Sequence, residues 1–168
     1  MIRLPERCED KHRLYALLQS QLKELIAVCP RPVPSMANAA ALLNDALTEI
    51  NWAGFYIYEE TSRQLVLGPF QGHAACILIP EGRGVCGTAA AEHRAQLVPD
   101  VNAFPGHIAC DSASRSEVVI PLLLGERLLG VLDIDSPVPA RFDEADAAGL
   151  SGLAALLCEA VDWSDFHV

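Results

Sequence analysis

The spacing of apolar side chains changes twice along this chain, and that change restricts the fold more than any other feature. Apolar residues recur at helical spacing within 14–29 and, after a proline-rich break at 30–34, again within 36–50. Ser35 is placed to cap the second of these helices. Helical spacing returns near the C-terminus behind Asp143, a residue type favoured at helix N-caps. Helices are therefore predicted towards both ends of the chain.

The middle region has the short apolar runs and turn residues that are typical of β-strands. Gly125-Glu126 suits a two-residue hairpin turn, and alanines favour a short helix at 88–93. Strands between helices predict an α+β fold, with one sheet and helices packed on one of its faces. The strands are expected at Trp52–Tyr58, Gln64–Gly68, Cys76–Ile79, Gln96–Pro99, Glu117–Leu124 and Arg127–Ser136.

Acidic residues outnumber basic ones, and the imbalance lies in one part of the chain. The net charge is −10, and residues 51–168 hold 16 acidic residues against six arginines. Such a surface repels phosphate, so we expect no nucleic-acid partner and no binding to anionic membranes. The N-terminal residues lack the apolar core of a secretory signal, and the longest strongly apolar run, Val118–Gly125, is too short to span a bilayer. These features predict a cytoplasmic protein with a single domain over residues 1–168.

Three of the six cysteines lie in the middle of the chain outside the predicted helices, and Cys8 lies in the N-terminal lead. In a reducing compartment, thiols that are not simply buried bind metal or carry out redox chemistry. Cys76 opens a predicted strand, whereas Cys86 precedes the short helix, whose free amides would stabilise a thiolate. Cys110 lies in a long irregular segment, with His107 and Arg115 as positive neighbours. All three are candidates for thiol chemistry.

Two other interpretations of the cysteines stay open at this point. A buried thiol often acts only as a small hydrophobic group, and that role is expected for Cys29 and Cys158 on the helical faces. The other three cysteines, together with His107, would supply four zinc ligands. However, nine and 23 residues separate these cysteines, unlike the short knuckles of structural zinc sites, so we expect no metal.

Carboxylates and aromatic residues form a second set of candidates. Asp133 and Asp135 are two apart in a predicted strand and therefore share one face, and Glu117 begins the preceding strand. Carboxylates this close repel one another, which raises at least one pKa and provides an acid or a seat for a cationic amine. A solvated acidic face is the alternative. Trp52 and Tyr56 also share a strand face and form either core or the wall of an apolar pocket.

Five strings of residues occur in one order along the chain: Asn51–Tyr56, Leu67–Gly72, Gly82–Ala89, Gly106–Asp111 and Gly130–Ser136. Together they closely resemble the free methionine-(R)-sulfoxide reductases, a branch of the GAF-domain fold. The resemblance runs from about residue 36 to 162, whereas the helix and proline-rich connection within 1–34 match least. It implies a GAF-like fold with a central antiparallel sheet, helices on one face, and a substrate pocket under loops on the other.

The resemblance also implies roles for the three cysteines. Cys110 matches the cysteine that attacks the sulfoxide sulfur and becomes a sulfenic acid. Cys76 matches the resolving cysteine, which closes a disulfide with it. Cys86 matches a position with either an attacking or a secondary resolving role. An external dithiol such as thioredoxin would complete the cycle, and no metal or organic cofactor is required.

The remaining candidates match the substrate pocket of that family. Glu117, Asp133 and Asp135 match its carboxylates, and Trp52 and Tyr56 match the aromatic residues around the methylthio group. A carboxyl with a raised pKa supplies the proton that the departing sulfoxide oxygen needs, and the other carboxylates hold the α-ammonium of a free amino acid. A ligand-sensing module and a thiol redox sensor without turnover are the competing functions. A homodimer is an open alternative to a monomer.

Overall fold

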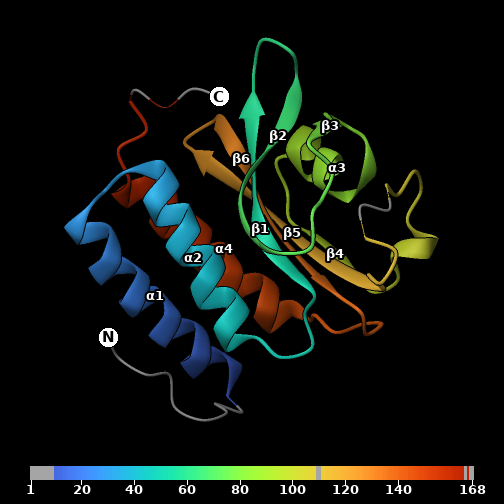
Figure 1. The fold of residues 1–168 in the computed structure, drawn as a ribbon, viewed down its shortest axis with the longest axis horizontal. Coiled ribbons are helices and arrows are strands. Elements are labelled where there is room, and N and C mark those ends of the chain that lie inside the picture. The colour runs from blue at the N-terminus through green and yellow to red at the C-terminus, as the bar shows by residue number, and fades with distance from the viewer. Residues whose placement is uncertain (1–9, 109–110, 165, 167–168) are drawn as a thin grey trace.

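A curled antiparallel sheet of six strands separates two sets of packed side chains (Figure 1). The computed structural model describes residues 10–108, 111–164 and 166. The strand order is β3-β2-β1-β6-β5-β4, and every neighbouring pair is antiparallel. The strands are β1 (Trp52–Glu59), β2 (Gln64–Gly72), β3 (Leu78–Pro80), β4 (Gln96–Val98), β5 (Ser116–Leu124) and β6 (Arg127–Ser136).

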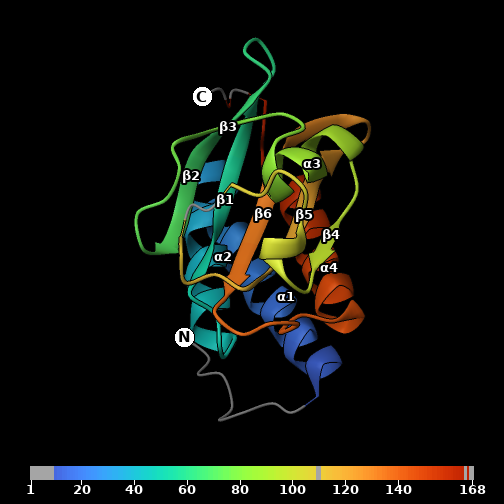
Figure 2. The same ribbon diagram turned by 90° about the vertical axis from the view of Figure 1, so that its right-hand side faces the viewer.

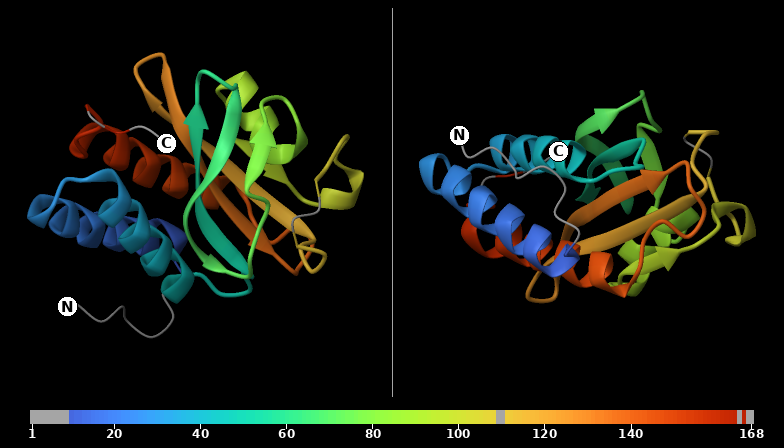
Figure 3. Two further views of the ribbon diagram at one scale, coloured as in Figure 1. Left: turned by 45° about the horizontal axis from the view of Figure 1, so that its top comes forward. Right: turned by 90° about the horizontal axis from the view of Figure 1, so that it is seen from below.

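Three long helices cover one face of the sheet, as the sequence predicted. They are α1 (Lys11–Val28), α2 (Pro32–Ala46) and α4 (Glu144–Ala160), and Figures 2 and 3 show them together on the same side. The short helix α3 (Gly84–Glu92) and a 3-10 turn (Val101–Ala103) lie on the opposite face. That face therefore carries an incomplete cover of one short helix and loops.

Alternation along β6 divides the two faces chemically. Leu132 and Ile134 are fully buried in the core beneath the three long helices. Asp133 and Asp135 project to the other face, since neighbouring residues of a strand point in opposite directions. The predicted strand face is confirmed, and it directs two carboxylates towards α3. The hairpin turn at Gly125-Glu126 is also confirmed, because Leu124 pairs with Arg127.

The beginnings of α2 and α4 show where local sequence rules hold and where they do not. Asp143 caps α4 through a full capping box, with Asp146 at the third helical position, as expected. Ser35 does not cap α2, because the helix already begins at Pro32 behind Arg31. The prolines fit inside the first helical turn, where amide donors have no helical partner. The proline-rich break therefore ends one helix and starts the next.

The chain from 76 to 92 also differs from the sequence-based boundaries. β3 begins at Leu78, so Cys76 precedes the strand instead of opening it. α3 begins at Gly84, which places Cys86 inside the first turn of the helix. A side chain at Gly87 would lie 2.4 Å from the Pro80 carbonyl oxygen, so glycine lets α3 approach the end of β3. This close approach brings Cys86 against the sheet.

No helix among the described residues is both long and apolar enough to cross a membrane.

Candidate active site

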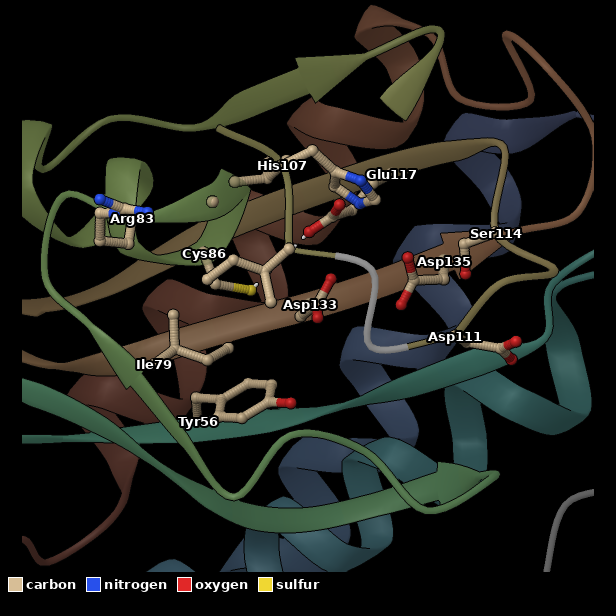
Figure 4. Close-up of a pocket in the computed structure, with 13 residues that line it drawn as sticks. Tyr56, Ile79, Arg83, Cys86, His107, Asp111, Ser114, Glu117, Asp133 and Asp135 are labelled. Atoms are coloured by element: carbon tan, nitrogen blue, oxygen red, sulfur yellow. Dashed lines mark hydrogen bonds between the residues drawn. The ribbon is translucent and has the colours of Figure 1, made fainter. Parts of the chain in front are cut away.

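A pocket opens on the α3 side of the sheet, and its walls come from distant parts of the chain (Figure 4). The floor is the face of β5 and β6 that points towards α3, and Tyr56 of β1 lies beside it. The N-terminus of α3 and the irregular segment around His107 and Ser114 complete the walls. The pocket therefore brings together Tyr56, Cys86, Glu117, Asp133 and Asp135 of the predicted site residues, whereas Cys76 and Trp52 do not line it.

Strand register brings the three predicted carboxylates together. Glu117 of β5 pairs directly with Asp135 of β6, and Val119 pairs with Asp133. Because Glu117 and Asp133 lie two positions apart in this register, their side chains share one face and lie diagonally across the two strands. Glu117 and Asp133 are each only 6% exposed. The alternative of a solvated acidic face is therefore wrong.

Burial sets the protonation state of this cluster. Loss of solvation raises the pKa of Glu117 well above its ordinary value, and the charge of Asp133 raises it further. Burial also raises the pKa of Asp133, to about 7, and burial followed by the charge of Asp133 raises that of Asp135. Oδ1 of Asp133 is buried and accepts no hydrogen bond from the described residues. These carboxyls therefore hold their protons to higher pH than ordinary Asp and Glu side chains do.

Cys86 belongs to the same cluster. Its thiol is buried and donates to Oε1 of Glu117 over 3.8 Å. Burial, and then the charges of Asp133 and Glu117, raise the pKa of Cys86 well above its ordinary value. The expectation that free helix amides would stabilise a Cys86 thiolate is therefore wrong, because carboxylates and desolvation outweigh the amides.

The compact group of possible cation ligands differs from the zinc set considered and rejected above. Ligand atoms of Cys86, Glu117 and Asp133 lie within 4.8 Å of one another. Cys76 of the rejected set is disulfide-bonded. Burial lowers the pKa of His107, which favours the neutral ring over the expected positive neighbour. Of the residues in that rejected set that the structure describes, only Cys86 is in the compact group.

Trp52 and Tyr56 lie side by side on the pocket face of β1. They are 2% and 1% exposed, and their ring centroids are 5.8 Å apart. The ring of Phe70 in β2 also stacks on Trp52, with their centroids 5.2 Å apart. Tyr56 lines the pocket directly, whereas Trp52 supports it from the end of the strand. Both predicted aromatic residues thus belong to one rigid apolar wall.

Cys110 lies outside the described residues, but the chain that follows it is well anchored. Asn51 Nδ2 donates to Oδ2 of Asp111 at 2.9 Å and to the Ser114 hydroxyl at 3.1 Å. The same Asp111 carboxylate lies 3.5 Å from Nδ1 of His73. These contacts tie the segment after Cys110 to the start of β1, at the pocket edge.

The N-terminus of α3 provides polar groups of the opposite sign, whose amides the sequence had suggested only as neighbours of a Cys86 thiolate. The amides of Gly84, Val85 and Cys86 occupy the first helical positions, where no helical carbonyl accepts from them. Arg83 precedes them and also lines the pocket. For Arg83 the sequence held no signal other than its place within the Gly82–Ala89 string. The pocket therefore has an acidic floor and a positively polarised side.

Comparisons with known proteins agree with this architecture. A family model described as the GAF domain matches residues 35–162. Free methionine-R-sulfoxide reductase of Escherichia coli (strain K12) is 48% identical over 157 residues, covering 94% of each chain. Protein YtsP of Bacillus subtilis (strain 168) is 50% identical over 161 residues, covering 96% of this chain and 99% of its own.

A solved structure shows the same similarity in three dimensions. The X-ray structure of free methionine-R-sulfoxide reductase from Neisseria meningitidis, in complex with its substrate, has a TM-score of 0.89 to this chain. The two sequences are 46% identical, and the match covers 95% of each chain. The GAF-like fold expected from the sequence is confirmed. This chain belongs to the GAF domain family and, within it, to the group that contains the free methionine-R-sulfoxide reductases.

Proposed function

We propose that this chain reduces free methionine-(R)-sulfoxide to methionine with thiols as the source of electrons. One observation carries the proposal: Glu117, Asp133 and Asp135 converge on the pocket floor, where burial raises the pKa of each of them. A sulfoxide oxygen needs a proton as its bond to sulfur breaks, and a carboxyl with a raised pKa supplies it. The Escherichia coli and Neisseria meningitidis relatives named above carry this activity in their names.

The proposed cycle begins at Cys110. Its sulfur attacks the sulfoxide sulfur, the oxygen takes a proton from the carboxyl cluster and ends on Cys110 as a sulfenic acid, and methionine leaves. The Cys76 thiol then condenses with the sulfenic acid, which forms the disulfide and releases water. The disulfide at Cys76 supports its resolving role. An external dithiol, for which we propose thioredoxin, reduces the disulfide by exchange. The homodimer stays a prediction.

Cys86 is proposed as a thiol that stays protonated during this cycle. A thiolate is the nucleophilic form of cysteine, and burial beside two carboxylates disfavours it here. The Cys86 thiol donates to Glu117 instead and so orients one of the carboxyl groups. This environment favours Cys110 over Cys86 as the attacking residue.

The decisive experiment is reduction of resolved sulfoxide epimers. Wild-type protein with a dithiol is expected to convert the free R epimer to methionine and to leave the S epimer. Pyramidal sulfur exchanges the positions of oxygen and lone pair between epimers, so a fixed proton donor reaches the oxygen of only one. Chiral chromatography of the remaining sulfoxide measures both. Equal consumption of the two epimers contradicts the proposal, and no consumption together with a peroxide-reactive thiol favours a redox sensor.

Selectivity for the free amino acid is a second expected result. The acidic floor suits an α-ammonium, and Arg83 with the α3 amides suits an α-carboxylate. Acetylation of the amine or amidation of the carboxylate removes one charge and leaves a buried group unpaired, which typically costs about 1–3 kcal/mol. We therefore expect kcat/KM to fall by roughly 10- to 100-fold for N-acetylmethionine sulfoxide and for methionine sulfoxide amide. Steady-state assays of the three compounds check this, and equal kcat/KM values would rule out recognition of both charges.

A further inference from the structure

The chain that carries Cys76 has little regular structure of its own. β2 ends at Gly72 and β3 begins at Leu78, so residues 73–77 cross between two strands without being part of either. The Ile77 carbonyl accepts from the amide of Leu67 at 2.9 Å, which fixes the far end of this segment. The position of Cys76 therefore depends on contacts made by side chains outside the segment.

Both aromatic residues of the pocket wall make such contacts. The hydroxyl of Tyr56 donates to the carbonyl oxygen of Cys76 at 3.1 Å. The indole Nε1 of Trp52 donates to the carbonyl oxygen of His73, also at 3.1 Å. The two hydrogen bonds hold the segment at Cys76 itself and three residues before it. They occur with Cys76 in its disulfide-bonded state.

The donors are themselves rigidly placed. Trp52 is stacked between Tyr56 and Phe70, and both Trp52 and Tyr56 are almost fully buried. A Cβ at Gly54, which lies between them on β1, would approach Phe70 to 2.3 Å, so glycine is required for this stack to form. Burial raises the pKa of Tyr56, so that its hydroxyl keeps its proton and remains a donor. The segment 73–76 is thus hydrogen-bonded to two buried, stacked aromatic side chains.

We propose that Tyr56 and Trp52 are positioning residues for the resolving cysteine, in addition to forming the pocket wall. This inference rests on the proposed function, since it concerns the step in which Cys76 closes the disulfide. In that step the sulfur of Cys76 attacks the sulfenic acid sulfur of Cys110, an S–S bond forms, and the S–O bond breaks. The thiol proton leaves with the hydroxyl as water, and no further oxidant is needed.

Placement decides the rate of such a step. Two sulfur atoms must come within bonding distance along a defined direction, and a freely moving segment reaches that arrangement less often. The Tyr56 hydroxyl restrains the Cys76 backbone directly and also lines the substrate pocket. The same side chain therefore lines the proposed substrate pocket and contacts the residue that we propose removes the sulfenic acid.

The test compares Tyr56→Phe with Tyr58→Phe. Tyr58 lies on the same strand, and its hydroxyl bonds Glu81 instead of the Cys76 segment, so the same chemical change serves as a control. Reduced protein is mixed with one equivalent of free methionine-(R)-sulfoxide in the absence of external dithiol, and samples are quenched over time. Methionine, the disulfide and the sulfenic acid trapped by dimedone are quantified in each sample by mass spectrometry.

Disulfide formation is expected to slow by roughly two- to tenfold per methionine released in Tyr56→Phe, the factor that one hydrogen bond is typically worth. Dimedone-trapped sulfenic acid should rise in the same proportion, whereas Tyr58→Phe should match wild type. Because both signals are divided by the methionine formed, a change in substrate binding does not alter them. Trp52→Phe, which keeps an aromatic ring and removes the indole donor, should shift the ratio in the same direction.

Three outcomes would overturn the inference. A wild-type ratio of disulfide to methionine in Tyr56→Phe shows that the hydrogen bond does not place Cys76. An equal slowing in Tyr58→Phe shows a general effect of strand β1. Slowing in Tyr56→Phe with no accumulation of sulfenic acid shows that another thiol resolves it. If wild-type protein forms no methionine, the proposed function fails. That result is distinct from the three outcomes above, which contradict only the positioning role of Tyr56 and Trp52.

Discussion

Cys110→Ser should form no methionine, even in a single turnover with one equivalent of free methionine-(R)-sulfoxide. Serine lacks the thiolate that attacks sulfoxide sulfur, so neither sulfenic acid nor product can appear. Cys76→Ser should still release close to one methionine per enzyme and then stop, because no thiol closes the disulfide that thioredoxin reduces. Quenched single-turnover assays with and without thioredoxin distinguish these results.

Cys86 and Cys29 provide the comparisons for this experiment. Cys29 is a free thiol at the end of α1, and Cys29→Ser should behave as wild type. Cys86→Ser should keep its burst, since the buried Cys86 thiol has a raised pKa and does not supply the thiolate. If Cys110→Ser keeps a full burst and Cys86→Ser loses it, the attacking residue is Cys86, and the environment of the pocket floor must change when substrate binds.

Removal of the proton donor is the second large effect that we expect. One of the variants Glu117→Gln, Asp133→Asn and Asp135→Asn should lose roughly 10²- to 10⁴-fold in kcat, the usual contribution of general acid catalysis. The other two should mainly raise KM. Each removes an interaction that binds the substrate equally well in the ground state and in the transition state, so kcat changes little. Steady-state kinetics on the three variants identify the donor. Wild-type kcat and KM in all three would leave the mechanism without its proton source.

The pH dependence gives an independent check on the same group. A proton donor must be protonated, and burial raises the pKa of all three carboxyls, that of Asp133 to about 7. The wild-type kcat should therefore persist through mildly acidic pH and fall above pH 7, by about tenfold per pH unit once the donor ionises. The amide variant of the donor should lose this alkaline limb. A kcat that rises with pH across the same range would assign a base, not an acid, to the rate-determining step.

Much of the site was visible in the sequence because it depends on local geometry. The alternation of a strand places Asp133 and Asp135 on one face whatever the strand packs against, and the structure confirms it. The turn at Gly125-Glu126 follows from turn chemistry in the same way. The five strings with family resemblance pointed to the GAF fold, which the comparisons confirm.

Other features depend on which segments meet, and no local rule contains that information. The strand register places Glu117 directly opposite Asp135. The sequence had suggested Glu117 only as a candidate member of the carboxylate cluster. When only its helix is considered, Cys86 is expected to have a lowered pKa and to form a thiolate. In the folded chain the sheet buries it against two carboxylates, and its pKa is raised instead. The helix start at Pro32 likewise depended on how the proline-rich connection enters the first turn of α2.

The strand and helix periods, the acidic face of β6 and the family resemblance could all be predicted, because each depends on the order of residues along a short stretch. The contacts of Tyr56 and Trp52 with the Cys76 segment, and the burial of Glu117 and Asp133, emerge only in the folded chain. Burial and contacts between distant segments arise when α3 and the loops close over the sheet. The solvation energies that control proton affinity are set at that point.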